Sequence, residues 1–149
     1  MREGLPLHPA LVHFPVAATV LAAGALLAGA ARSGSARAPW LDRATFLLAT
    51  AVLSTPAAIA SGRAWSGTLR LWSGFSLLPP LDAEDGLLRR HVLGAVLTLV
   101  LAFVALILAL ASRSGRASLW PVVFVSAAAA AAACLTAHVG GTMAFGIHT

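Results

Sequence analysis

The chain has 149 residues, of which 59% are hydrophobic and 10% are charged, and its mean hydropathy is +0.88. Soluble domains carry about 25% charged residues, so this composition excludes an ordinary water-soluble globule. All basic residues are arginines that lie between apolar runs, so the net charge of +5 indicates membrane topology and argues against a nucleic-acid-binding face.

Four apolar runs are long enough to cross a membrane, which requires about 20 mostly apolar residues. The predicted spans are residues 10–31, 41–62, 91–111 and 119–139. Short polar turns separate the first two spans and the last two. The longer connection, residues 63–90, is expected to lie in the membrane interface. We therefore expect a single all-α membrane domain over residues 1–149.

Small residues recur along the spans at alternating spacings of four and three, and these stripes mark the predicted packing faces. In the first span the stripe is His13, Ala17, Val20, Gly24, Leu27 and Ala31. In the second span it is Ala44, Leu48, Ala51, Thr55, Ala58 and Gly62. In the third span it is His91, Ala95, Thr98, Ala102, Ala105 and Ala109. Because lipid provides no hydrophobic force between helices, close approach over small residues predicts a left-handed four-helix bundle with these stripes inside.

The two halves of the chain resemble each other. His13 precedes Trp40 by 27 residues, His91 precedes Trp120 by 29, and an Arg-Ser-Gly turn lies between the members of each pair. This pattern predicts two parallel copies of one helical hairpin, related by an axis along the membrane normal. In such a repeat His13 and His91 are counterparts. Convergence through composition alone is the alternative.

An even number of spans brings both termini and the long connection to one side of the membrane. All five histidines are expected on that side: His8, His13, His91, His138 and His148. The two short turns carry arginines close to helix ends, where the positive-inside effect is strongest. We therefore expect the turns in the cytoplasm, and the histidine face and both termini on the periplasmic or external side.

The histidines are the candidate ligands of a cofactor. Two neutral imidazoles on facing helices suit the iron of a b-type haem, which makes His13 and His91 the expected axial ligands. His8 and His138 are expected to form a second pair or to orient the first. Arginines at the same side are expected to pair with the haem propionates. These arginines are Arg63, Arg89 and Arg90.

Copper or zinc is an alternative, since imidazoles bind both metals. The same four histidines would then be the ligands, with Met143 as a soft ligand for copper. In another reading the histidines bind no cofactor, and their amphipathic rings only cap helices at the membrane interface.

Other kinds of chemistry find little support. The sequence contains no acid–base pair, no Ser/His/Asp set and no phosphate-binding loop, so an electron carrier or a subunit is favoured over a stand-alone enzyme. Cys134 is the only cysteine, which excludes an internal disulfide and a covalent CxxCH haem. No charge lies in the middle of a span, which argues against a pump or transporter.

The leading functional prediction is a membrane-embedded electron-transfer subunit. Its expected partners are the lipid bilayer, a quinone or redox protein, and a second copy of the chain, with no nucleic acid. The competing prediction is a non-redox subunit that anchors or assembles a larger complex through its small-residue faces.

Three motifs carry a family resemblance. The first span opens with Leu7–Pro15 (LHPALVHFP) and the third with His91 and Gly94, and a His-x-Gly-Gly motif near the end of the chain contains His138, Gly140 and Gly141. Over nearly the whole chain this pattern resembles a bacterial membrane family catalogued as domain of unknown function 2231. The resemblance implies a multi-pass protein of the bacterial inner (cytoplasmic) membrane. Some members are fused to Rieske iron–sulfur domains, which implies a redox setting in which the partner of this protein is a separate chain.

Overall fold

The computed structural model describes residues 7–66, 86–115 and 118–145. These residues form four long helices and a short 3-10 helix: α1 (Leu7–Ala30), η1 (Gly34–Arg37), α2 (Ala38–Ser66), α3 (Gly86–Arg113) and α4 (Leu119–Phe145). All four long helices have the length and apolar composition of membrane spans. The prediction of an all-α four-helix membrane protein is confirmed.

The connection between α2 and α3 is shorter than the predicted residues 63–90. Residues 63–66 continue α2, and residues 86–90 form the first turn of α3. The remaining residues of the predicted interfacial segment, 67–85, lie outside the described part of the chain.

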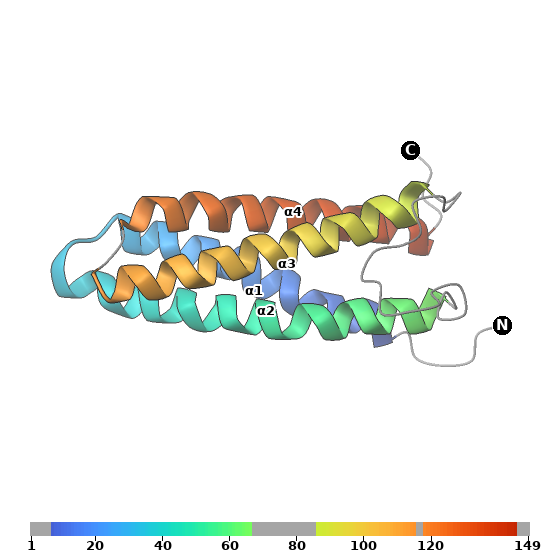
Figure 1. Ribbon diagram of the computed structural model, residues 1–149, viewed down its shortest axis with the longest axis horizontal. Coiled ribbons are helices and arrows are strands. Elements are labelled where there is room, and N and C mark those ends of the chain that lie inside the picture. Colours follow the sequence, from blue (N-terminus) through green and yellow to red (C-terminus); the bar gives the residue numbers. More distant parts are fainter. Residues whose placement is uncertain (1–6, 67–85, 116–117, 146–149) are drawn as a thin grey trace.

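The helices form two hairpins. Helix α1 packs along α2 and α3 packs along α4, while contacts of α1 with α4 and of α2 with α3 join the hairpins. The start of α1 and the end of α4 lie at one end of the bundle, here called the terminal end, and the two tight turns lie at the opposite turn end (Figure 1). The hairpins diverge toward the terminal end (Figure 1).

The two tight turns use the same local chemistry. In each Arg-Ser-Gly sequence the glycine has a positive φ, +59° at Gly34 and +72° at Gly115. Glycine adopts this conformation without the steric penalty of a Cβ atom. Helix α4 then begins after Ser118, whose Oγ accepts a hydrogen bond from the Trp120 backbone N–H at 3.4 Å. These residues allow the chain to reverse direction within a few positions.

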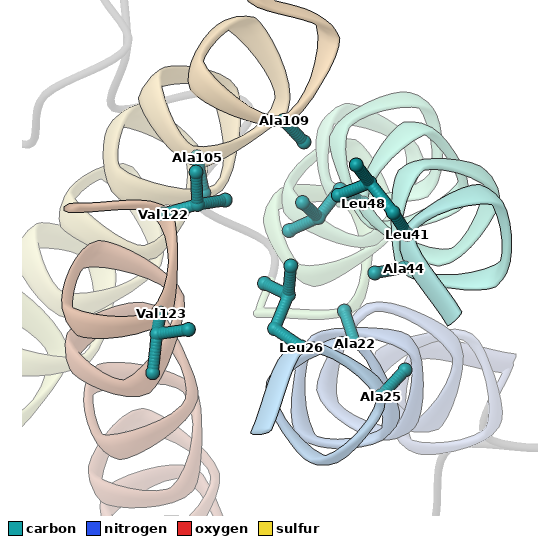
Figure 2. Packing of buried hydrophobic residues seen from close by; sticks show 10 residues of the cluster. All are labelled: Ala22, Ala25, Leu26, Leu41, Ala44, Leu48, Ala105, Ala109, Val122 and Val123. Atoms are coloured by element: carbon teal, nitrogen blue, oxygen red, sulfur yellow. The ribbon is translucent and has the colours of Figure 1, made fainter. Parts of the chain in front are cut away.

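Small side chains fill the interior and large ones cover the outside. Figure 2 shows side chains from all four helices meeting near the turn end, where Leu26 and Leu48 are surrounded mainly by alanines and valines. By contrast Phe46 is 72% exposed and Leu53 is 78% exposed. This distribution agrees with a bundle that packs through close backbone approach and presents its large apolar groups to lipid.

The predicted packing stripes are confirmed for two helices. In α2 the buried positions include Ala44, Leu48, Ala51, Thr55 and Ala58. In α3 they are Thr98, Ala102, Ala105 and Ala109. The stripe predicted for α1 is wrong, because all six of its residues, from His13 to Ala31, are exposed.

The interior face of α1 is a second stripe with similar spacing. It contains Pro15, Thr19, Ala22, Leu26 and Gly29. Helix α1 is apolar on all sides and carries small residues on both of these faces. A periodicity of small residues therefore fits either stripe, and contacts with the other helices decide between them.

The two hairpins repeat each other at many of their interior positions. The α1 positions 8, 15, 19, 22 and 26 correspond to the α3 positions 91, 98, 102, 105 and 109, which lie 83 residues later. The buried α2 positions 44, 45, 48, 51 and 55 correspond to the buried α4 positions 122, 123, 126, 129 and 133, which lie 78 residues later. The offset shortens because η1 lengthens the first turn. The predicted repeat is thus visible in the packing, with His8 and not His13 as the counterpart of His91.

Candidate histidine site

The described histidines all lie toward the terminal end of the bundle. His8 is in the first turn of α1 and His13 follows it on the same helix, while His91 is near the start of α3 and His138 is near the end of α4. His148 lies outside the described residues. Topology alone therefore brings four remote sequence positions to one end of the molecule.

Only two of these histidines face each other. The ring centroids of His8 and His91 are 6.2 Å apart, and their planes are nearly perpendicular at 85°. Both side chains are half-buried. Because α1 and α3 are diagonal in the bundle and the two residues are counterparts in the repeat, the pair lies between the hairpins, near the pseudo-two-fold axis.

A backbone carbonyl of the neighbouring helix orients the ring of His91. Its Nδ1 lies 3.0 Å from the carbonyl oxygen of Thr136 in α4. A carbonyl oxygen can only accept a hydrogen bond, so Nδ1 carries the proton. In the neutral imidazole the lone pair is then on Nε2, the nitrogen available to a metal.

His8 repeats this arrangement in the first hairpin. Its Nδ1 lies 3.1 Å from the carbonyl oxygen of Ala58 and 3.0 Å from Oγ of Ser61. Ser61 donates its own hydroxyl proton to the Ala58 carbonyl at 2.8 Å, which leaves its oxygen as an acceptor for Nδ1–H. Ala58 and Thr136 are counterparts in the repeat. Both imidazoles thus use Nδ1 as a donor and keep the lone pair on Nε2.

Two glycines make room for the rings. A Cβ atom built on Gly62 would lie 2.7 Å from Cε1 of His8, and one built on Gly140 would lie 2.7 Å from Cε1 of His91. These separations are shorter than real Cβ contacts, so any larger residue would displace the imidazole. Each half-site therefore consists of a histidine, a carbonyl and a glycine, contributed by both helices of one hairpin.

The other predicted ligands do not join this pair. His13 is exposed, and its Nδ1 lies 2.5 Å from the carbonyl of Pro9 in its own helix. The prediction that His13 faces the interior opposite His91 is therefore wrong. His138 is also exposed. Among the described residues, no group of three or more His, Cys, Asp or Glu side chains is arranged to hold a metal ion.

The predicted arginines and methionine lie at the same end. Arg89 and Arg90 are exposed in the first turns of α3, and Met143 in α4 is 37% exposed. Arg63 directly follows Gly62 in α2, but its side chain lies outside the described part.

The described residues around the histidine pair do not form a packed core. Within residues 7–14, 59–62, 86–97 and 134–143, no described residue is buried. The buried residues begin farther along each helix and continue toward the turn end. The two imidazoles therefore lie outside the packed core that the described residues form, at the end where the hairpins diverge (Figure 1).

A family comparison covers almost the entire chain. The family described as predicted membrane protein (DUF2231) matches residues 4–149. The chain belongs to this family. No curated protein and no solved structure matches it.

The family resemblance seen in the sequence is confirmed. This DUF2231 protein is a multi-pass membrane protein that contacts the lipid bilayer. The opening LHPALVHFP motif of the DUF2231 chain supplies His8 to the pair, whereas the second histidine of the motif, His13, points outward. Of the Gly-Gly pair after His138, Gly140 accommodates the His91 ring. The sequence indicated both motifs, but not that His8 of the first and Gly140 of the second both lie against His91.

Proposed function

We propose that the protein is a membrane-embedded electron-transfer subunit in which His8 and His91 are the axial ligands of a b-type haem. The observation that carries this proposal is the pair of half-buried imidazoles, one from each hairpin, each with Nδ1 bonded to a carbonyl of its neighbouring helix. Hydrogen bonds from the second ring nitrogen are the usual support of a metal-bound histidine, because they fix the tautomer and the ring orientation.

The separation of the two rings suits a shared metal centre. A metal bound at about 2 Å by Nε2 of each imidazole would hold the ring centroids about 6 Å apart. The observed separation is 6.2 Å. The perpendicular ring planes do not oppose this, because two imidazoles that bind one metal need not be coplanar.

The number of ligands favours haem over a bare zinc ion. Structural zinc takes four protein ligands, whereas the iron of a haem has four nitrogens from the macrocycle and needs only two axial side chains. The two imidazoles belong to different hairpins, so the macrocycle would lie between the hairpins, where the described residues form no packed core. Arg89 and Arg90 lie near the start of α3, at the terminal end of the bundle. These two arginines and Arg63 would pair with the haem propionates.

A haem in this position would supply a one-electron couple, and the protein would set its orientation and surroundings. We propose a quinone or a redox protein as the electron donor or acceptor, with a second copy of the chain as a further partner. Anchoring of a larger assembly without redox chemistry is the competing function.

An absorption spectrum of the detergent-purified full chain tests the proposal. We expect a Soret band, a sharp band in the visible region after reduction with dithionite, and iron in about equal amount to the chain. A colourless protein without bound metal would contradict the redox function and favour the anchoring role. Copper or zinc in place of iron, with no Soret band, would also contradict the haem assignment.

We also propose that the protein lies in a bacterial inner membrane with the turn end in the cytoplasm, because the tight turns carry arginines beside helix ends. In a Cys134→Ser background, we expect a membrane-impermeant maleimide to label Ser76→Cys in intact spheroplasts. We expect Ser35→Cys to be labelled only after the membrane is opened. The reverse labelling pattern would show that the orientation is inverted.

A further inference from the structure

The turn end of the bundle carries an excess of positive charge. Four described arginines lie there: Arg32, Arg37, Arg43 and Arg113. Within residues 7–66, 86–115 and 118–145 the single carboxylate is Asp42, and it forms an ion pair with Arg113 at 2.9 Å. This end is therefore suited to contact anions at the membrane surface.

A cavity of about 290 Å³ opens at this end between the two turns. Its lining combines the basic side chain of Arg37 and the hydroxyl-bearing Ser112 and Ser118 with the apolar residues Ala30, Leu119 and Trp120. A basic and hydroxylated wall beside an apolar and aromatic wall matches the boundary between phospholipid headgroups and acyl chains.

Two residues that line this cavity differ in character from their counterparts in the internal repeat. Asp42 in α2 corresponds to Trp120 in α4, and Arg113 in α3 corresponds to Ala30 in α1. At the α2–α3 contact these positions hold the ion pair between Asp42 and Arg113. At the α4–α1 contact the same positions hold Trp120 and Ala30, both of which line the cavity. The repeat is thus broken at one charged pair, and the two uncharged counterparts of this pair border the cavity.

Two hydrogen bonds orient the Arg37 guanidinium group and leave its Nη1 donors outside these bonds. Its Nε and Nη2 atoms donate to the carbonyl of Arg32 at 3.1 and 2.9 Å, which uses one edge of the guanidinium group. The Nη1 donors are not part of these bonds. Ser118 accepts a hydrogen bond from Trp120 through Oγ and retains its hydroxyl proton for donation. A guanidinium group and a hydroxyl in one cavity are donors that fit phosphate oxygens.

Two other arginines at this end are engaged elsewhere. The guanidinium carbons of Arg32 and Arg43 lie 4.7 and 4.9 Å from the ring centroid of Trp40. These distances are typical of cation–π contacts. Neither residue lines the cavity, so Arg43 serves as a control for the general effect of charge.

We propose that this cavity binds a phosphate group, held by Arg37 and Ser118, and that the phosphate belongs to the headgroup of an anionic phospholipid. The apolar wall of Trp120 and Leu119 would contact the start of the acyl chains. This site is at the opposite end of the bundle from His8 and His91, so it stands or falls independently of the haem proposal.

Binding of phosphatidylglycerol to the detergent-purified full chain, measured by native mass spectrometry and by thermal unfolding, tests the site. Phosphatidylcholine and inorganic phosphate are measured in parallel. We expect Arg37→Gln to weaken phosphatidylglycerol binding about tenfold. Ala30→Leu, which fills the cavity without changing the charge, should have a similar effect. The control Arg43→Gln removes the same charge at the same end and should bind like the wild type.

The outcomes separate the possible explanations. Equal losses in Arg37→Gln and Arg43→Gln would show a diffuse charge effect and overturn the site. Wild-type binding in Arg37→Gln would overturn it as well, provided that circular dichroism shows the same helix content. Stabilisation by inorganic phosphate to the same extent as by phosphatidylglycerol, lost in Arg37→Gln, would identify a soluble anion as the occupant and overturn the lipid assignment.

Discussion

Replacing either His8 or His91 with alanine is expected to lower the haem content of the purified protein to about a tenth of the wild-type value or less. Each substitution removes one of the two imidazoles that face each other at 6.2 Å. The remaining ring belongs to the other hairpin and has no described histidine within the interior to replace its partner. The measurement is the reduced-minus-oxidised spectrum together with the iron content per chain.

His13→Ala and His138→Ala are the matched controls. Both histidines lie toward the same end of the bundle, but their side chains are exposed. His13 is only five positions from His8 on the same helix and belongs to the same motif. We expect both variants to keep the wild-type spectrum. Loss of the bands in His13→Ala with retention in His8→Ala would reverse the assignment of the first ligand.

Replacing Gly140 with alanine is the second change with a large expected effect. Glycine to alanine within a helix usually stabilises a protein by about 0.5–1 kcal/mol, because alanine loses less conformational freedom on folding. At Gly140 the added methyl group would lie 2.7 Å from Cε1 of His91. The ring must turn away and give up its bond to the Thr136 carbonyl. We expect haem occupancy to fall about tenfold, which is within the range for loss of a group that orients a ligand.

The neighbouring Gly141 provides the control for this effect. A Cβ atom at Gly141 would meet no other atom within 4 Å. We therefore expect Gly141→Ala to keep full haem occupancy and to unfold at the same or a slightly higher temperature. Gly62→Ala should behave like Gly140→Ala, because it faces His8 in the same way. Full occupancy in both Gly62→Ala and Gly140→Ala would show that these contacts do not position the ligands.

The number and approximate positions of the helices could be predicted because the bilayer fixes the length of an apolar span. The interior faces of α2 and α3 could also be predicted, since in these helices the small residues lie on one face and the large residues on the other. In α1 the predicted stripe that starts at His13 and the interior stripe that contains Pro15 and Thr19 have similar spacing. The hydroxyl of Thr19 was the distinguishing signal, because a polar group in a span usually faces the protein interior.

Half of the candidate site could be predicted. Periodicity places His91 on the interior stripe of its helix, and there its ring lies opposite that of His8. The residue that faces His91 could not be predicted correctly from the repeat. Alignment of the two halves through Trp40 and Trp120 pairs His91 with His13 and not with His8. The added residues of η1 give the first helices of the hairpins a different offset from the second helices. The fit of each imidazole against Gly62 or Gly140 depends on contacts between helices, which periodicity within one helix does not contain.

The division of the histidine pair between two equivalent hairpins has a consequence for assembly in the membrane. Neither hairpin contains both histidines. A group bound by both rings would therefore link the two hairpins, and it could bind only after the second half of the chain has inserted. Its binding free energy would add to the association of the hairpins at the end where their described residues form no packed core. The stability of the folded bundle would then come from the bound group at the terminal end and from the alanine-rich core near the turn end.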